Sequence, residues 1–401
     1  MLMLQRLSFW KIMGGLFLLS GLAAAVVRFG WGLGAATNLS DIAPWGLWIG
    51  FDVVTGVGLA AGGFTIAGMT YIFNIKRFKP IVRPAILTAF LGYLLVIVGL
   101  LLDLGRPWSI WHALIYHNYQ SVLFEVAMCV MIYTAVLALE FSPVIMERFK
   151  LHRTLKVIKA ITIPLIIAGI LLSMLHQSSL GSLYLIIPQK MHPFWYSPLL
   201  PVLFFVSAII VGLSMTIVEA YLSARAFQKT LETPLLRELA RIMIAVLLVF
   251  FTLRFLDLGH RGALPLLFDG SHEAAMMWLE IALMLFIPLI LFNVRGWGRS
   301  RQGLFFTAVS FVSGFVMNRL NTTMTSLERY YQEQFGVTYF PSVGEIAVTL
   351  SIVTAGFVIF GLAVKYLPIF PHAVEEEETV LDLASGRTTD VLERSTSPEY
   401  Q

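Results

Sequence analysis

Charge and cysteine are both scarce in this sequence. Only 13% of its 401 residues are charged and 58% are apolar, whereas roughly a quarter of the residues of a soluble domain are charged. This composition predicts a membrane protein. The single cysteine, Cys129, excludes an internal disulfide and an iron–sulfur cluster held by this chain, because such a cluster needs about four thiolates. Any such cluster must belong to a partner.

Long polar stretches are missing before residue 371, so no room remains for a soluble catalytic domain. A helix needs roughly 20 apolar residues to cross a bilayer, and the apolar runs therefore predict an all-α integral membrane protein of about ten transmembrane helices. The first run has no clear cleavage site, so we expect an uncleaved first span. The predicted spans lie near residues 9–33, 44–73, 84–104, 118–140, 155–177, 198–224, 236–257, 272–294, 302–322 and 342–367.

Basic residues are distributed unevenly among the predicted loops. The N-terminal segment and the even-numbered loops contain 18 of them, whereas the odd-numbered loops contain only Arg106, Lys190, Arg261 and Arg329. Because basic loops stay on the cytoplasmic side, we expect a multi-pass protein of the cytoplasmic (inner) membrane with both termini in the cytoplasm. The net charge of +4 thus gives no reason to expect a nucleic-acid partner.

Two short matches indicate an internal repeat. The sequence Leu-Asp-Leu-Gly closes a predicted span at 102–105 and again at 256–259, and Glu125 and Glu280 then follow at nearly equal distances. Four spans separate the copies, which predicts two four-helix bundles in the same orientation plus two extra helices.

This repeat divides the chain into five predicted parts. They are a first transmembrane helix with an external loop (1–43), a first four-helix bundle (44–180), a second four-helix bundle (181–325), a last transmembrane helix (326–371) and an acidic tail (372–401). Glu375–Glu378 and the Ser/Thr-rich remainder lack apolar periodicity, so the tail is predicted to be disordered and cytoplasmic.

Charged side chains within spans are candidate site residues, because each costs about 2.5–3.5 kcal/mol to insert at the bilayer centre. Most are expected toward the external ends of their spans, whereas Glu140 and Glu219 lie near the cytoplasmic ends. For Arg28, Arg319 and Glu345 an interface role is the simpler interpretation. The external group comprises Arg28, Asp52, Asp103, Glu125, His176 with Gln177, Arg254, Asp257, Glu280, Arg319 and Glu345.

Asp103, Glu125 and His176 are the predicted catalytic residues. Acids and an imidazole inside a bundle can hydrogen-bond quinone carbonyls and exchange protons with the ring. We expect the quinone to be bound by His176, Gln177, Asp52 and Arg106. Glu140 and Glu219 are candidates for a proton path from the cytoplasm and are equally well explained as interface residues.

Two features argue against further sites in this chain. The second bundle has Asn318–Arg319 where the first has His176, so we expect one active and one structural bundle. Of eight histidines only His176 is expected within a span. Because a b-type haem usually needs axial histidines inside the helices, no haem and no metal site are expected, although a pairing of His176 with a loop histidine stays open.

Several segments resemble the NrfD/PsrC family of quinone-interacting membrane subunits, and most closely its HybB-type branch, the membrane subunit of a nickel–iron hydrogenase. The resemblance extends over residues 9–371 and is most specific at His176–Leu183 with His192–Pro193. The other matching segments are 44–52 (PWGLWIGFD), 82–85 (VRPA), 121–125 (SVLFE) and 138–141 (ALEF).

The resemblance implies an integral subunit without a redox cofactor of its own. Such a subunit exchanges electrons between menaquinone or another quinone and a periplasmic four-cluster iron–sulfur protein. Further partners would be hydrogenase, molybdopterin or multihaem cytochrome subunits, so the chain would belong to a quinone oxidoreductase without being catalytic alone. The family places its quinone pocket at the external side of the first bundle.

The sequence is also compatible with two other classes of protein. An ion-coupled secondary transporter also uses repeated bundles with intramembrane acids, although Pro164 and Pro288 are the main helix interruptions here. A structural membrane anchor for an external oxidoreductase would need no protonatable cluster. The identity of the electron donor or acceptor, the direction of quinone chemistry, electrogenic turnover and oligomeric state do not follow from the sequence.

Overall fold

The structure, a computed structural model, describes residues 9–227 and 233–370, and within these ranges it is helical without strands. It contains 10 helical segments long and apolar enough to cross a membrane, as predicted. The predictions for the tail 372–401 lie outside the described residues. The ten segments are Phe9–Trp31, Trp48–Ile72, Lys76–Asp103, Val122–Arg148, Thr162–Ile186, Leu200–Phe227, Thr233–His260, His272–Asn293, Arg301–Phe335 and Val343–Tyr366.

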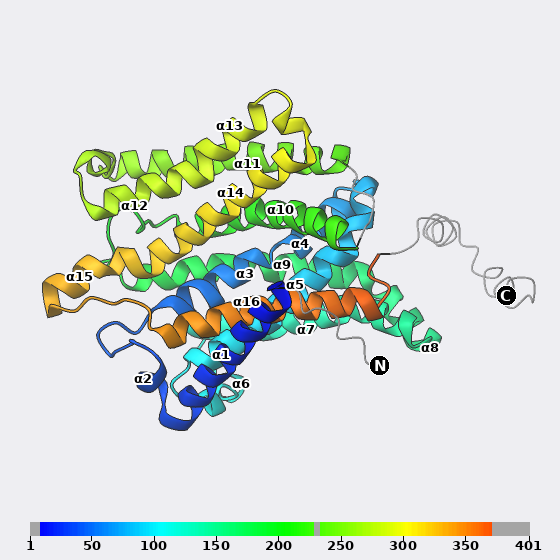
Figure 1. The fold of residues 1–401 in the computed structure, drawn as a ribbon, viewed down its shortest axis with the longest axis horizontal. Coiled ribbons are helices and arrows are strands. Elements are labelled where there is room, and N and C mark those ends of the chain that lie inside the picture. The colour runs from blue at the N-terminus through cyan, green and yellow to red at the C-terminus, as the bar shows by residue number, and fades with distance from the viewer. Residues whose placement is uncertain (1–8, 228–232, 371–401) are drawn as a thin grey trace, which may run out of the picture.

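Three of these segments combine α-helical and π-helical turns, so each of the three contains more than one helix. Figure 1 labels the α-helices. The α-helices are α1 Phe9–Trp31, α2 Leu33–Ala36, α3 Gly56–Leu59, α4 Gly62–Ala67, α5 Lys79–Asp103, α6 His112–Ile115, α7 Val122–Arg148, α8 His152–Ala160, α9 Thr162–Ser182, α10 Leu200–Phe227, α11 Thr233–His260, α12 His272–Ile281, α13 Ile287–Asn293, α14 Arg301–Leu320, α15 Ser326–Phe335 and α16 Val343–Tyr366. The π-helical turns are η1 Trp48–Thr55, η2 Gly68–Ile72, η7 Ala282–Phe286 and η9 Asn321–Thr325. The 3-10 turns are η3 Lys76–Phe78, η4 Pro107–Ser109, η5 Leu183–Ile186, η6 Leu264–Phe268 and η8 Trp297–Arg299.

Nine of the described α-helices form two groups. The first helix group is a ring of α4, α5, α7 and α9, and the second comprises α10, α11, α12–α13 and α14. Helix α10 joins them by packing on α4 and α9. At this contact the backbones approach closely, since a Cβ atom on Gly212 would lie 2.9 Å from the carbonyl carbon of Ala61. Small residues permit such close packing of helices in a membrane.

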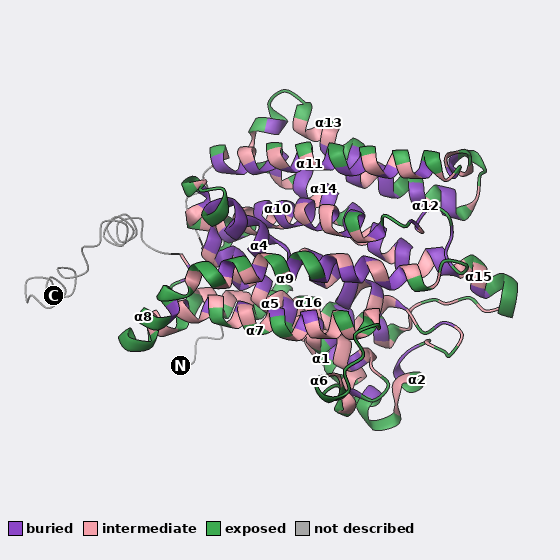
Figure 2. Cartoon of the chain, turned by 180° about the vertical axis from the view of Figure 1, so that it is seen from behind, coloured by how far each residue is buried: buried purple, intermediate pink, exposed green. Residues whose placement is uncertain are grey.

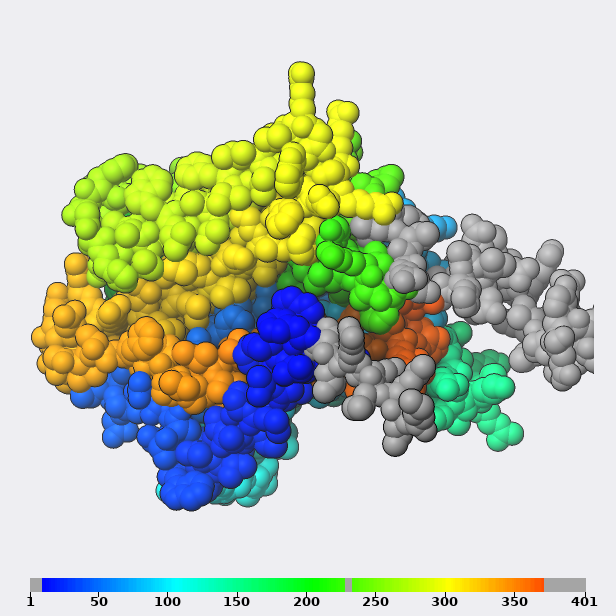
Figure 3. All heavy atoms as spheres, in the orientation of Figure 1, coloured from blue at the N-terminus to red at the C-terminus, as the bar shows by residue number. Residues whose placement is uncertain are grey.

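Burial is greatest in the middle of the molecule (Figure 2). In an 18-residue apolar stretch of the span Trp48–Ile72, 78% of the residues are buried, whereas the corresponding share is 11% in α1 and in α16. These two helices pack on each other at the periphery, and Figure 3 shows them side by side, α1 in blue and α16 in orange. Below, the end of the molecule that carries α15 is called the α15 end, and the opposite end, which carries α8, the α8 end (Figure 1).

The start of α16 is tied to the core. Ser342 and Glu345 form a capping box, and Glu345 also accepts hydrogen bonds from the hydroxyl of Tyr339 and, at 3.1 Å, from the backbone N–H of Asn38. The indole of Trp48 donates to the Glu345 carbonyl at 3.1 Å. Glu345 is 0% exposed, so these contacts lie inside the protein.

The fifth span differs from the prediction of 155–177. Residues 152–160 form α8, a separate basic and amphipathic helix that contains Lys156 and Lys159, and the span itself begins at Thr162 and ends at Ile186. Pro164 lies in the first turn of α9, where proline is tolerated. His176 therefore lies about 15 Å from the end of the span, at a rise of 1.5 Å per residue. His176 thus lies nearer the middle of its span than the predicted bounds of 155–177 placed it, because the lysines of α8 stay out of the apolar span.

Candidate functional site

His176 lies inside the first helix group, on α9. It is 0% exposed, and its Nδ1 is hydrogen-bonded to the hydroxyl of Tyr93 on α5 at 2.8 Å. Its Nε2 has no partner among the described residues. The next side chain, Gln177, donates from Nε2 to the carbonyl of Val57 at 3.1 Å. One imidazole nitrogen is thus held in place, and the other is available to a ligand or a proton.

Glu125 and Ser179 connect the surroundings of His176 with the protein surface. Ser179 lies one turn beyond His176 on the same face of α9, and its hydroxyl donates to the carboxylate of Glu125 on α7. Ser179 is buried, whereas Glu125 is exposed. The hydrogen bond thus brings an exposed carboxylate to a residue one helical turn from the buried imidazole.

Two acids gather near the α15 end of α5. Asp52, in η1, packs against Gly99, where a Cβ atom would lie 2.8 Å from the Asp52 Cβ. Asp52 Oδ2 accepts a hydrogen bond from the Thr349 hydroxyl at 2.8 Å, and its Oδ1 has no partner among the described residues. Asp103 lies within electrostatic range of Asp52 and Arg28, and its Oδ1 is likewise unpartnered.

The predicted trio of Asp103, Glu125 and His176 does not form one compact cluster. Tyr93, the partner of His176, and Asp103 are both on α5, about 15 Å apart along the helix axis. The structure therefore places Glu125 near the segment of His176 and places Asp103 with Asp52 instead. Arg106 is exposed in the loop after α5.

Glu140 lies at the contact between α7 and α9, as Glu125 and Ser179 do, but toward the α8 end. It packs over Gly169, where a Cβ atom would lie 2.9 Å from Glu140 Oε1. The hydroxyl groups of Tyr133 and Ser173 lie near each other along this contact, and neither has a hydrogen-bond partner among the described residues. Polar groups thus occur along the α7–α9 contact from Glu140 to His176.

Glu219 lies at a different helix contact. Its Oε2 accepts a hydrogen bond from the hydroxyl of Thr88, which connects α10 to α5, at 2.6 Å. The two acids of the predicted proton path are therefore on separate contacts of the structure, and only Glu140 shares the α7–α9 contact with His176.

Glu280, the counterpart of Glu125 in the second helix group, is completely buried (0% exposed). It forms an ion pair with Arg254 at 2.7 Å. It also accepts hydrogen bonds from Trp195 at 2.9 Å, Asn318 at 2.9 Å and Asn321 at 3.0 Å. This many donors satisfy both carboxylate oxygens, which is typical of a structural ion pair.

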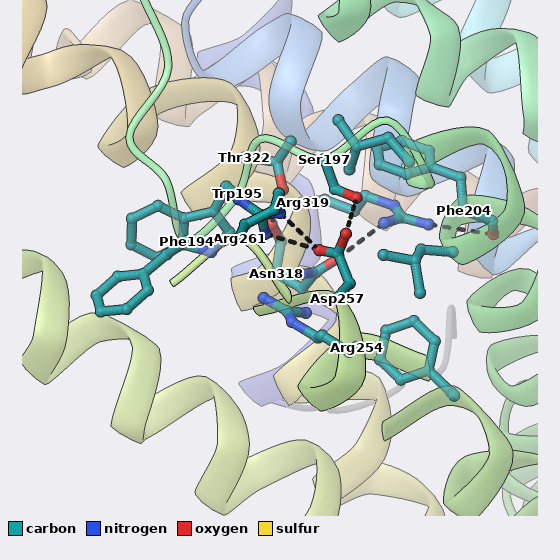
Figure 4. Close-up of a pocket in the computed structure, with 13 residues that line it drawn as sticks. Phe194, Trp195, Ser197, Phe204, Arg254, Asp257, Arg261, Asn318, Arg319 and Thr322 are labelled. Carbon is teal, nitrogen blue, oxygen red and sulfur yellow. Dashed lines mark hydrogen bonds and ion pairs between the residues drawn. The ribbon is translucent and has the colours of Figure 1, made fainter. Parts of the chain in front are cut away.

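Asp257, the counterpart of Asp103, lines a cavity of about 20 Å³. It accepts hydrogen bonds from Arg261 at 2.7 Å and from Ser197 at 2.9 Å, as Figure 4 shows. The cavity is lined by Phe194, Trp195, Ser197, Leu200, Leu203, Phe204, Phe250, Arg254, Asp257, Arg261, Asn318, Arg319 and Thr322.

His192 lies in the loop between α9 and α10, outside the spans. It is 5% exposed, and its backbone N–H donates to the Ser326 carbonyl at 2.8 Å. Its Nδ1 accepts a hydrogen bond from the N–H of Phe194 at 3.3 Å. Burial lowers the pKa of His192 below its usual value, although the nearby Glu273 acts in the opposite direction. The neutral form of His192 therefore holds the loop in place through these hydrogen bonds.

Tyr93, Tyr133 and Ser173 are neighbours of the site that were not expected from the sequence. The two tyrosines lie in apolar stretches on other helices, where a tyrosine gives no signal of its own. Ser173, His176 and Ser179 are spaced by three residues, which puts them on one helix face. That spacing could have identified the serines once His176 was a candidate.

Comparison with known proteins identifies a family model, described as polysulphide reductase, NrfD, that matches residues 35–327. A protein of Nitratidesulfovibrio vulgaris is 38% identical over 90% of this chain and 94% of its own length.

Two further relatives have informative names. The probable Ni/Fe-hydrogenase 2 b-type cytochrome subunit of Escherichia coli is 34% identical over 86% of this chain and 88% of that protein. The menaquinone reductase integral membrane subunit of Nitratidesulfovibrio vulgaris is 29% identical over 88% of this chain and 92% of that protein.

Proposed function

Since the chain belongs to the polysulphide reductase NrfD family, we propose that it is the integral membrane subunit of a respiratory complex that exchanges electrons and protons between a quinone pool and an iron–sulfur protein. One relative is named as a b-type cytochrome subunit of a Ni/Fe-hydrogenase and another as the integral membrane subunit of a menaquinone reductase. The second name supports a quinone, and menaquinone in particular, as the substrate. Catalysis requires the partner, because this chain has one cysteine and supplies no cluster.

The unpartnered Nε2 of His176 is the observation that carries this proposal. An imidazole whose other nitrogen is held by Tyr93 presents Nε2 in a fixed direction. Nε2 hydrogen-bonds to one carbonyl oxygen of the quinone ring and transfers a proton to it during reduction, or takes one from the quinol hydroxyl during oxidation. His176 has no exposed surface, so the ring enters by displacing side chains around it.

Protons are proposed to reach His176 along α9. Glu125 is exposed and hydrogen-bonded to Ser179, so it exchanges protons with the surroundings and passes them toward the imidazole. Asp103 and Asp52, each with an unpartnered oxygen, serve as further proton acceptors nearer the α15 end. Gln177 orients the site through its hydrogen bond to Val57. The exposed Arg106 contributes positive charge at the surface where the quinone is proposed to enter.

A second proton route starts at the α8 end. Glu140 is its proposed entrance, because it shares the α7–α9 contact with Ser173 and His176. Glu219 lies on another contact and is proposed as a separate entry point that reaches Thr88 on α5.

The membrane orientation is part of the same proposal. The uneven distribution of basic residues supports an α8 end in the cytoplasm and an α15 end outside, in the cytoplasmic membrane. The iron–sulfur protein then docks on the loops of the α15 end and exchanges two electrons per quinone. Hydrogenase, molybdopterin or multihaem cytochrome subunits would complete the electron path.

The relative from Escherichia coli is named as a b-type cytochrome subunit, and such a name implies a haem in that protein. A b-type haem held inside helices usually needs axial imidazoles there. Among the described spans, only His176 lies away from a span end, and its Nδ1 is engaged by Tyr93. A bis-histidine haem does not fit these residues, and the proposed mechanism includes none.

The proposal is tested in the assembled complex with His176→Gln and His176→Asn. Neither amide exchanges protons as imidazole does, so quinone-linked electron transfer is expected to fall roughly 10²–10⁴-fold. Electron transfer from the partner enzyme to a soluble dye should stay unchanged, which reports that the complex has assembled. The exposed His260 gives a matched control, and His260→Gln should keep the wild-type rate.

Wild-type quinone activity in an assembled His176→Gln complex would contradict the assignment. Purification of the native complex separates the remaining classes of protein. A redox subunit copurifies with an iron–sulfur protein and bound quinone, an anchor with the protein alone, and a secondary transporter with neither.

A further inference from the structure

The cavity beside Asp257 carries an imbalance of charge. Three guanidinium groups line it, those of Arg254, Arg261 and Arg319, but only one carboxylate, that of Asp257. Glu280 does not line the cavity, but it adds a second carboxylate nearby through its ion pair with Arg254 at 2.7 Å. Because the cavity lies between membrane-spanning helices, such an imbalance is costly.

Arg319 is the guanidinium without a carboxylate partner. Arg261 is paired with Asp257 at 2.7 Å and Arg254 with Glu280, and no ion pair of Arg319 occurs in the ranges that the structure describes. Glu280 lies close enough to influence Arg319, but its oxygens are already engaged by other donors. The positive charge of Arg319 therefore lacks a direct counter-charge.

Neutral groups hold Arg319 in place without balancing its charge. It donates to the Asn318 side chain at 2.8 Å and to the Ser207 hydroxyl at 2.7 Å. Its guanidinium carbon lies 3.6 Å from the ring centroid of Phe204 and 4.5 Å from that of Phe315. These contacts fix the side chain, which is 2% exposed, and yet Nε has no hydrogen-bond partner in the described part of the chain.

We propose that this cavity binds one small monovalent anion of the size of chloride, which supplies the missing negative charge beside Arg319. A cavity of about 20 Å³ holds roughly one water-sized species, so a quinone ring, a lipid headgroup and a sulfate ion are all too large. A water molecule fits the volume but leaves the charge of Arg319 unbalanced. Arg254 and Arg319 line the cavity from α11 and α14, and the aromatic residues Phe204 and Phe250 are also part of its lining.

The site is independent of the proposed quinone chemistry, since it lies in the second helix group with no residue in common with the surroundings of His176. An anion here joins α10, α11 and α14 at the α15 end, where these helices are held together by buried polar contacts. It therefore contributes to stability, and chloride removal is expected to loosen the second helix group and not to abolish electron transfer directly.

Thermal unfolding of the purified complex, followed by intrinsic tryptophan fluorescence, provides the test. Chloride is titrated against gluconate at constant ionic strength, and the unfolding midpoint is expected to rise by a few degrees and then saturate. Bromide should replace chloride, whereas sulfate should not. In crystals grown with bromide, an anomalous peak is expected in the cavity beside Arg319.

Variants link the effect to the site. Arg319→Gln should lose the dependence on chloride, and Arg319→Lys should keep it with weaker binding, which preserves the test if the glutamine variant fails to fold. Arg329→Gln is the matched control, because Arg329 pairs with Glu273 outside the cavity, and it should respond as the wild type does. A midpoint independent of chloride, an unchanged response in Arg319→Gln, or an empty cavity in the bromide experiment would each overturn the proposal.

Discussion

The hydroxyl of Tyr93 is 2.8 Å from Nδ1 of His176, and this hydrogen bond connects α5 to α9 in the interior of the first helix group. It determines which imidazole nitrogen is left for a substrate. Both residues are 0% exposed, so water does not compete for the bond.

Removing this hydroxyl should therefore impair quinone chemistry. In Tyr93→Phe the imidazole loses its fixed orientation, and quinone-linked turnover is expected to fall roughly tenfold, short of the roughly 10²–10⁴-fold that a general acid–base group itself contributes. Steady-state quinone kinetics over a range of pH measure the effect, and a shifted pH profile identifies a positioning role.

Tyr133→Phe is the matched control for that variant. Tyr133 packs edge-on against Tyr93 with ring centroids 4.6 Å apart, and its hydroxyl has no hydrogen-bond partner among the described residues. Equal losses in both variants would indicate that ring packing matters and that the bond to His176 does not.

Glu280→Gln should reduce stability and leave the chemistry intact. The change leaves Arg254 as a buried charge without its partner, which costs about 3–5 kcal/mol when a buried pair is broken. Thermal unfolding and the yield of assembled complex measure the loss, and turnover per assembled complex should stay near the wild-type value. A specific loss of quinone turnover at full stability would instead give the second helix group a direct part in catalysis.

Acid should destabilise the loop that contains His192. Burial lowers the pKa of His192 in the folded protein below the ordinary value of about 6.5. The unfolded chain then binds the extra proton, so the stability from neutral His192 is fully present above that value and is lost as the pH falls below it. Thermal unfolding between pH 8 and pH 5 measures the slope, which should be flatter in His192→Gln. Equal slopes in the two proteins would rule this source of pH dependence out.

The capping box of α16 gives a fourth expectation. In Ser342→Ala the N–H of Glu345 loses its side-chain acceptor at 3.1 Å, and a lost N-cap costs about 0.5–2 kcal/mol. Ser342→Asp retains an acceptor at this position and should recover most of the loss. The unfolding midpoints of the two variants measure the difference.

The number and approximate places of the spans could be predicted from the sequence, because apolar run length is a direct consequence of bilayer thickness. The start of α9 could not be predicted, because the apolar residues on one face of α8 extend the apolar run, while Lys156 and Lys159 occupy the opposite face. That error shifted the expected depth of His176.

The candidate site was only partly predictable for a related reason. His176, Glu125 and Asp103 are visible in the sequence because titratable groups are rare in spans. Whether they meet depends on rotation and register between helices, and the structure separates Asp103 from Tyr93 by about 15 Å along α5. The complete pairing of Glu280 also depends on Trp195 and Asn321, which no repeat pattern indicates.

The last helix matters more than its peripheral position suggests. Thr349 and the carbonyl of Glu345 are the hydrogen-bond partners of Asp52 and of the Trp48 indole. A protein truncated before Val343 would still have nine apolar segments, but it would leave a carboxylate oxygen and an indole N–H facing hydrocarbon in the second span. Shortened versions made for expression should therefore keep α16 even where activity assays are not intended.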